Sequence, residues 1–241
     1  MHDENFIKLE LAAFTGLSLE TVQEYLDRKV YPCHRQEFPF WHPKNDADMR
    51  WFYAASRSYL FANAIHVLPV PLAREILVGL EKIHSGRVLD FGGGTGNFSF
   101  TLAQRDFGCD VTYFDIGIIQ CQFVRFVANR HSLNIRVIQG QADYNWEFPH
   151  WNQVTHAVHN GLMGAILALD VLEHIPDYPK YIERMSGEWL QLGGRMYVRA
   201  PFGYGDPTHL ADSHNILRVM QDNNLYLEKT VSGVEIWVKD K

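Results

Sequence analysis

The stretch Val88-Leu-Asp-Phe-Gly-Gly-Gly-Thr-Gly-Asn97 decides the fold of this 241-residue chain. It opens as a short apolar strand, predicted over Arg87–Phe91, with the acidic residue Asp90 near its end. A turn with four glycines in five positions follows, and the next residues predict a helix over Asn97–Gln104. Such a turn brings bare backbone N–H groups against a ligand at a helix N-terminus. The stretch therefore predicts an α/β fold with a ligand site at the turn.

The spacing of the turn discriminates between three nucleotide-type ligands. A phosphate-binding P-loop requires Lys followed by Ser or Thr, and this pair is missing after Gly92. A dinucleotide fingerprint would place its third glycine at the position of Asn97. The Asp90 carboxylate would repel a pyrophosphate but attract the sulfonium and amino groups of S-adenosylmethionine (SAM). The pattern therefore favours SAM, and a glycine turn without any ligand is the remaining alternative.

The second predicted strand ends in an acidic residue that suits the nucleoside part of SAM. The strand Asp110–Phe114 is β-branched and aromatic, and it runs into Asp115. This position lies about twenty residues past the glycine turn, where a carboxylate can accept hydrogen bonds from both ribose hydroxyls. Ile116 follows directly and is placed to pack on a face of the adenine.

Two further strand ends bring polar side chains to the same edge of the sheet. A strand over Ile135–Ile138 precedes Ala142 and Asp143. Asp143 is a candidate acceptor for the adenine amino group, with an ordinary loop role as the alternative. A fourth strand, about Ala165–Leu169, runs into Asp170. The residues assigned to the cofactor are Asp90, Gly92, Gly93, Gly94, Gly96, Asp115, Ile116, Ala142, Asp143 and Asp170.

Taken in order, these motifs resemble those of class I SAM-dependent methyltransferases. The resemblance rests on V-L-D-F-G-G-G-T-G, Y-F-D-I and A-L-D-V-L-E-H-I-P-D, the last being especially similar to the small-molecule branch that includes quinone-biosynthesis methyltransferases. Leu192–Pro201 resembles that family's turn and fifth strand, and Asp206–Leu210 resembles the loop after it. The resemblance covers about two thirds of the chain, from Glu81 onward. It implies methyl transfer from SAM to a small-molecule acceptor.

The predicted fold class is a doubly wound, Rossmann-like, seven-stranded and mostly parallel sheet. Strands that alternate with helices after residue 80 predict a parallel sheet covered on both faces. The last strands, Leu225–Val231 and Val234–Val238, predict a C-terminal antiparallel hairpin around Ser232-Gly233. We expect residues 81–241 to form the SAM-binding methyltransferase domain.

Residues 1–80 predict a helical N-terminal cap, because no strand pattern there is convincing. Helices are expected over Phe6–Phe14, Ser18–Lys29 and Asp46–Val67. Gly16 would stop the first helix and Ser18 would cap the second, with Leu19, Val22, Leu26 and Val30 on one face. The first two helices also have the outline of a helix-turn-helix motif. The second carries Glu20, Glu24 and Asp27, which DNA phosphates would repel, so a substrate-enclosing cap is favoured.

Two histidines are the candidate catalytic residues. A base is needed only where the acceptor loses a proton, and histidine is suited to this near neutral pH. His174 follows the fourth strand and His209 lies in the loop after the fifth, both on the expected substrate side; orienting loops is their alternative role. Tyr53, Tyr59 and Tyr204 are candidates for contact with the substrate.

A metal site is the alternative use of the segment after the fourth strand. Asp170, Glu173 and His174 would share one face if the segment were helical, and two carboxylates with a histidine suit a divalent ion. The same letters recur in related methyltransferases that need no metal, and we expect none here.

Composition limits the partners. The formal net charge of -6 argues against a nucleic-acid substrate, which needs clustered Lys and Arg. The absence of any apolar run of about eighteen residues argues against a membrane span. The amino-terminal residues do not resemble a secretory signal, and three cysteines without C-x-x-C spacing suggest reduced thiols, so a cytoplasmic protein is expected. A homodimer is left open.

Two alternatives to methyl transfer remain at this stage. One is an enzyme that cyclises SAM or transfers another group from it in the same pocket. The other is a non-catalytic SAM-binding protein that uses the cap to bind a partner.

Overall fold

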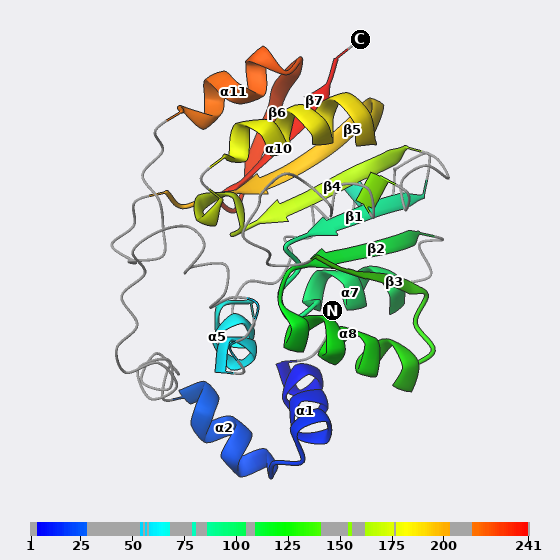
Figure 1. The fold of residues 1–241 in the computed structure, drawn as a ribbon, viewed down its shortest axis with the longest axis vertical. Helices are drawn as coiled ribbons and strands as arrows, with labels where there is room; N and C mark the ends of the chain where they lie inside the picture. The colour runs from blue at the N-terminus through cyan, green and yellow to red at the C-terminus, as the bar shows by residue number, and fades with distance from the viewer. Residues whose placement is uncertain are drawn as a thin grey trace.

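The computed structural model is a central sheet with helices on both faces and further helices beyond one face (Figure 1). The structure describes residues 4–27, 54, 56, 58–67, 79–80, 86–104, 109–140, 154–155, 162–175, 177–202 and 214–240. None of the helices within these residues has the length and apolar character that crossing a membrane requires.

The sheet has seven strands in the order β3-β2-β1-β4-β5-β7-β6. The strands are β1 (Arg87–Phe91), β2 (Asp110–Asp115), β3 (Ile135–Gln139), β4 (Met163–Leu169), β5 (Leu190–Arg199), β6 (Leu225–Val231) and β7 (Val234–Lys239). Strands β1 to β5 pair in parallel, whereas β7 is antiparallel to β5 and β6. The predicted mostly parallel sheet with a C-terminal antiparallel hairpin is confirmed.

The strand order reverses between β1 and β4. The chain builds outward from β1 through β2 to β3, then returns to place β4 on the other side of β1. In open α/β sheets, ligands bind beyond the carboxyl ends of the strands at such a reversal. This topology places the glycine turn after β1 and the segment after β4 beside each other.

The helices divide between the two faces of the sheet. They are α1 (Glu4–Thr15), α2 (Leu19–Asp27), α5 (Ser58–Val67), α7 (Asn97–Gln104), α8 (Ile118–Arg130), α10 (Tyr178–Arg184) and α11 (Ile216–Asp222), with a 3-10 turn η1 (Leu172–His174) and a π-helical turn η2 (Met185–Trp189). Helices α7 and α8 lie on one face and α10 and α11 on the other (Figure 1). The helix predicted over Asn97–Gln104 is confirmed.

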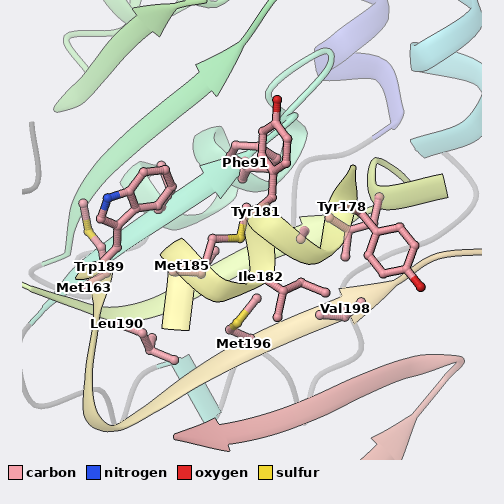
Figure 2. Packing of buried hydrophobic residues seen from close by; sticks show 14 of the residues in the cluster. Phe91, Met163, Tyr178, Tyr181, Ile182, Met185, Trp189, Leu190, Met196 and Val198 are labelled. Carbon is pink, nitrogen blue, oxygen red and sulfur yellow. The ribbon is translucent and has the colours of Figure 1, made fainter. Parts of the chain in front are cut away.

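The core on the α10 face is large and aromatic (Figure 2). Trp189, at the end of η2, is fully buried against it. Phe91 of β1 stacks on Phe114 of β2 with ring centroids 5.1 Å apart, and Tyr181 of α10 lies 5.9 Å from Phe91. Burying a side chain of this size stabilises the fold by about 1.5–3 kcal/mol. The layer fixes the carboxyl ends of β1 and β2 against α10.

The N-terminal helices share a core with α7 and α8 on the opposite face. Leu11 of α1 and Val22 of α2 are both fully buried, in one cluster with Phe123 and Val124 of α8. Glu10 accepts a hydrogen bond from His131 Nε2, just after α8, at 2.9 Å when that nitrogen carries the proton. Helices α1 and α2 are therefore packed firmly onto the Rossmann-like layer.

The local signals predicted for α1 and α2 agree with the structure where it describes them, with one exception, and Val30 lies outside the described residues. Gly16 has a φ of +72° after α1, where glycine avoids the steric cost of a Cβ. The Ser18 hydroxyl accepts a hydrogen bond from Thr21 N at 3.1 Å and so caps α2. Leu19, expected on the buried face, is 49% exposed because it begins the helix outside the contact with α1.

The turn expected before the fifth strand lies inside that strand instead. Strand β5 already begins at Leu190, which pairs with Met163 of β4, and pairing resumes at Arg195 with Ala165. The residues between form a bulge in which Gly193 has a φ of +72°. A bulge lets the ladder continue past the extra residues, so the glycines interrupt the pairing without ending the strand.

Candidate functional site

The glycine turn is bound tightly to the end of β2. Gly92 N and Gly93 N donate hydrogen bonds to the Phe114 carbonyl oxygen at 2.8 and 3.2 Å. Gly92 has a φ of +68°, and a Cβ there would lie 2.3 Å from the Val171 side chain after β4. A Cβ at Gly96 would lie 2.6 Å from Val124 of α8. Both positions exclude a side chain, so the turn lies directly against its neighbours.

Asp115 joins two turns through its carboxylate. Its Oδ2 accepts a hydrogen bond from Gly94 N at 2.8 Å, and its Oδ1 accepts one from Gly117 N at 2.7 Å. Burial raises the pKa of this carboxyl to about 6, although the hydrogen bonds from Gly117 and Gly94 favour the charged form. Each carboxylate oxygen keeps a lone pair for another donor. The predicted nucleoside residue is therefore fixed at the carboxyl end of β2.

Asp90 lies beneath the glycine turn. Its Oδ2 accepts a hydrogen bond from Ser99 Oγ of α7 at 2.6 Å, and Asp90 is only 3% exposed. A Cβ at Gly93 would lie 2.8 Å from this same oxygen, so the glycine leaves room for the carboxylate. Burial raises the pKa of Asp90 to about 6. Asp90 thus supplies negative charge directly below the turn.

Tyr113 of β2 was missed by the sequence reasoning. Its hydroxyl donates a hydrogen bond to the Gly94 carbonyl oxygen at 2.7 Å, and its ring is fully buried under Gly93. Burial raises the pKa of the phenol well above its usual value, so the hydroxyl stays a donor. Tyr113 lies two residues before Asp115 on β2 and so points to the same face of the sheet, a signal that a strand prediction could have supplied.

Helix α5 contacts the glycine turn. The Asn63 side chain reaches Gly94 so closely that a Cβ there would lie 3.0 Å from Asn63 Nδ2. Tyr59 precedes Asn63 by four residues and therefore shares its side of the helix. The half-buried Tyr59, a predicted substrate contact, thus belongs to the helix surface on which Asn63 meets the turn. Asn63 had no sequence signal, because only the packing of α5 reveals its position.

The segment after β4 is held by Arg199 of β5. Arg199 Nε donates to Asp170 Oδ1 at 2.6 Å, Arg199 Nη2 bonds Asp170 Oδ2, and Asp170 N donates to the Arg199 carbonyl oxygen at 2.7 Å. Asp170 also has a φ of +54°, an unfavourable conformation for a residue with a side chain. The paired arginine, which sequence reasoning missed, explains how this conformation is maintained. The Asp170 carboxylate therefore forms an ion pair with Arg199.

His174 ends the 3-10 turn and Glu173 lies behind it. The Glu173 residue is 0% exposed, and neither carboxylate oxygen has a hydrogen-bond partner within the described residues. Burial raises the pKa of Glu173 to about 8. His174 Nε2 lies 3.8 Å from Glu173 Oε1, and the histidine side chain is 15% exposed. The candidate base therefore keeps some access to solvent beside a buried acid.

The alternative metal site is not assembled. Asp170 precedes η1 and pairs with Arg199, so it does not share a helical face with Glu173 and His174. Across the described ranges, no group of three His, Cys, Asp or Glu side chains is arranged to hold a metal ion.

Some of the predicted site residues lie outside the described residues. They are Tyr53, Ala142, Asp143, Tyr204 and His209. Their assignments stay predictions.

Comparison with known proteins identifies the family. A family model described as a methyltransferase domain matches residues 53–226. The chain belongs to this methyltransferase family. The match begins ahead of α5 in the chain and includes the glycine turn, Asp115 and the segment after β4.

Two curated relatives of this methyltransferase are ubiquinone biosynthesis O-methyltransferases. The protein from Pectobacterium atrosepticum is 26% identical over 118 residues, which are 48% of this chain and 43% of that protein. The protein from Pectobacterium carotovorum is also 26% identical over 118 residues, which are 44% of its length. The matched part thus spans less than half the length of the curated relatives.

Solved structures show the same fold at low identity. Magnesium protoporphyrin IX methyltransferase from Synechocystis, solved with bound SAM, has a TM-score of 0.56 and 15% identity, and the match covers 83% of this chain and 100% of that one. An O-methyltransferase family protein from Burkholderia thailandensis has a TM-score of 0.52 and 12% identity, covering 79% of this chain and 63% of that one.

SAM is the cofactor of the methyltransferase, and the described residues fit it. A side chain at Gly93 would collide with Tyr113 and Asp90, and one at Gly94 would crowd Asn63, so the turn consists of backbone alone at both positions. The Asp115 carboxylate sits at the end of the neighbouring strand with lone pairs to accept from hydroxyls. The buried Thr95 hydroxyl has no partner within the described residues and lies in the same turn. The site thus offers close backbone approach, acceptors and unpaired polar groups.

Proposed function

We propose that this protein transfers a methyl group from SAM to a small-molecule acceptor. The observation that carries the proposal is the Asp115 carboxylate at the end of β2, which joins Gly117 to Gly94 in the turn after β1, where the strand order reverses. Membership in the methyltransferase family supports the reaction class. The negative net charge supports a small molecule over a nucleic acid.

The residues of the turns would bind the cofactor. The backbone of Gly92 to Gly96 would approach its methionine part, with the Asp90 charge beneath, and Asp115 would accept from the ribose hydroxyls. Ile116, which is half-buried against the core after β2, would pack on the adenine. When bound, SAM would supply a methyl carbon that its positive sulfur activates for attack by the acceptor, and the bond from this carbon to sulfur would break to release S-adenosylhomocysteine. The protein's own task is orientation, which can contribute several kcal/mol.

His174 is the candidate base for an acceptor that must lose a proton. Its position at the carboxyl end of β4 and its partial exposure support this role. A phenol or alcohol needs such a base, whereas an amine already deprotonated does not. The names of the curated relatives specify O-methylation and make oxygen acceptors the first to test. His209 is the second candidate base.

Helix α5 is the candidate acceptor-side wall. Tyr59 and Asn63 occupy one side of it, and Asn63 meets the glycine turn. An aromatic ring and an amide at this place suit a planar acceptor with a polar group, in keeping with the predicted roles of Tyr53, Tyr59 and Tyr204.

The test is incubation of the purified protein with methyl-labelled SAM and a metabolite extract, followed by mass spectrometry. We expect S-adenosylhomocysteine and a labelled product in equal amounts. Methylthioadenosine in place of S-adenosylhomocysteine would show cyclisation or transfer of another group. Tight SAM binding without turnover across phenols, alcohols and amines would identify a non-catalytic SAM-binding protein and overturn the proposal.

A further inference from the structure

Gln120 has a buried side-chain amide without a partner at the edge of the cofactor site. It lies in the first turn of α8 and is 1% exposed. Neither Oε1 nor Nε2 has a hydrogen-bond partner among the described residues. A buried polar group left without a hydrogen-bond partner destabilises the fold. An apolar residue would fill this position without that cost, so the amide requires an explanation.

Gly117 provides the space for the Gln120 amide. A Cβ at Gly117 would lie 2.1 Å from Gln120 Oε1, so the amide would have to move away to make room for a side chain. The φ of Gly117 is −68°, which any residue can adopt, so backbone conformation does not explain the glycine. The pair is therefore coupled, because the amide folds back over the N-terminus of α8 only while position 117 lacks a side chain.

The folded-back amide lies beside the Asp115 carboxylate. The same Cβ position at Gly117 is 3.1 Å from Asp115 Oδ1. This oxygen also accepts the hydrogen bond from Gly117 N at 2.7 Å. One small turn thus brings together a carboxylate, which only accepts, and an amide, which both donates and accepts.

We propose that Gln120 binds the ribose of SAM together with Asp115. A hydroxyl that donates its proton to Asp115 keeps two lone pairs, which need a donor when the site is closed from water. Gln120 Nε2 supplies that donor, and Gln120 Oε1 can accept from the second hydroxyl of the diol. The Gln120 amide and the ribose hydroxyls would thus satisfy each other's hydrogen-bonding groups. This inference rests on the proposed function, because it takes SAM as the ligand.

Calorimetry with S-adenosylhomocysteine and SAM tests the role of Gln120. Gln120→Met keeps length and removes both hydrogen-bonding groups, and it is expected to weaken binding of both ligands about ten- to a hundredfold. Gln122→Met, on the exposed side of the same helix, is the matched control and should bind within about twofold of the parent. The melting temperature of unliganded Gln120→Met should equal or exceed that of the parent, since a buried unpaired amide is removed.

A ligand lacking one ribose hydroxyl distinguishes ribose recognition from general packing. The loss caused by Gln120→Met should shrink several-fold with 2′-deoxy- or 3′-deoxy-S-adenosylhomocysteine, because the contact is then already missing. Gly117→Ala displaces the amide while keeping its chemistry, and it should weaken binding without adding to the effect of Gln120→Met.

Three results would overturn the inference. Unchanged ligand affinity in Gln120→Met would show that Gln120 does not contact the ligand. Equal losses of affinity for the deoxy and parent ligands would show that Gln120 does not bind the ribose. A lowered melting temperature of the unliganded variant with unchanged affinity shows a structural role. Failure of the proposed function is distinct, because the parent protein itself would then bind neither SAM nor S-adenosylhomocysteine.

Discussion

Side chains from β2 hold the glycine turn at the level of single atoms. Tyr113 donates to the Gly94 carbonyl oxygen from below, and Asp115 accepts from the Gly94 N–H. The two residues are two positions apart on one strand and point to the same face, so a single register of β1 against β2 sets both contacts. The position of the turn backbone therefore depends on these two side chains as much as on its glycines.

Removing the Tyr113 hydroxyl tests this dependence. Tyr113→Phe is expected to weaken SAM binding by about 1 kcal/mol, roughly fivefold, because the Gly94 carbonyl oxygen loses its donor. Tyr226→Phe, on the half-exposed ring of β6, is the control. Isothermal titration calorimetry gives both values. Equal affinities for parent and Tyr113→Phe would show that the glycines position the turn alone.

Removing the Asp115 carboxylate tests the ribose assignment. Asp115→Ala is expected to weaken SAM binding by about 1–3 kcal/mol through lost charged hydrogen bonds. Asp222→Ala, at the exposed end of α11, should leave affinity unchanged. An unaltered dissociation constant in the Asp115 variant would remove this residue from the cofactor site.

Individual residues were predictable where strand ends marked them. Asp90 and Asp115 were assigned from their places before and after the glycine turn, and the structure brings both to it. Asn63 and Gln120 were not found, because their positions follow from helix packing and from the room left by a glycine. Such contacts join residues far apart in the chain or folded back within a turn, and hydrophobic periodicity carries no information about them.

At the scale of elements, a polar contact surrounded by apolar packing joins α1 to the end of α8. Glu10 has a side chain that is 5% exposed and lies 2.9 Å from His131 Nε2 and 3.6 Å from Arg130 Nε. Phe6 packs on the His131 ring with centroids 5.1 Å apart. The contact aligns α1 on the end of α8 and so supports the shared core.

Glu10→Ala is expected to loosen α1 selectively. The lost hydrogen bond and packing should lower the stability of α1 by about 1–2 kcal/mol, so its amides exchange faster. Hydrogen exchange read by mass spectrometry measures this, with β1 and β4 as internal references. Glu20→Ala, exposed on α2, is the control. Unchanged exchange across α1 would mean that apolar packing alone fixes the helix.

Elements were more predictable than contacts. The helix over Asn97–Gln104 and the hairpin around Ser232-Gly233 agree with the sequence patterns, because capping and turn chemistry act within a few residues. The prediction of a turn at Gly193 and Gly194 was wrong, since glycines are used in bulges as well as in turns. Only pairing with β4 decides between them, and that pairing is not local.

At the scale of the whole molecule, two buried carboxyls (Asp90 and Glu173) and one half-buried carboxyl (Asp115) share one electrostatic property. Burial raises the pKa of Asp90 and Asp115 to about 6 and of Glu173 to about 8. A raised acid pKa means that the folded state holds its proton more tightly than the unfolded chain. The stabilisation is complete below about pH 4 and is lost as the pH rises through the folded values.

The free energy of unfolding should therefore fall between pH 5 and pH 8. Glu173 dominates the upper part of this window, so Glu173→Gln should reduce the fall by about 1–3 kcal/mol. Urea unfolding at both pH values measures it, and Glu188→Gln, half-exposed on η2, is the control. A variant with the parental pH dependence would show that Glu173 ionises as readily in the folded protein as in the unfolded chain.

The double use of Asp115 has a consequence for the kinetics of cofactor exchange. Its hydrogen bonds from Gly94 N and Gly117 N are made within the chain itself, so both turns are preorganised. Little conformational entropy is then lost when SAM binds, and little is regained when S-adenosylhomocysteine leaves. Arrival should be a docking event onto a rigid edge, and residence time should depend on the contacts made rather than on reshaping of the loops.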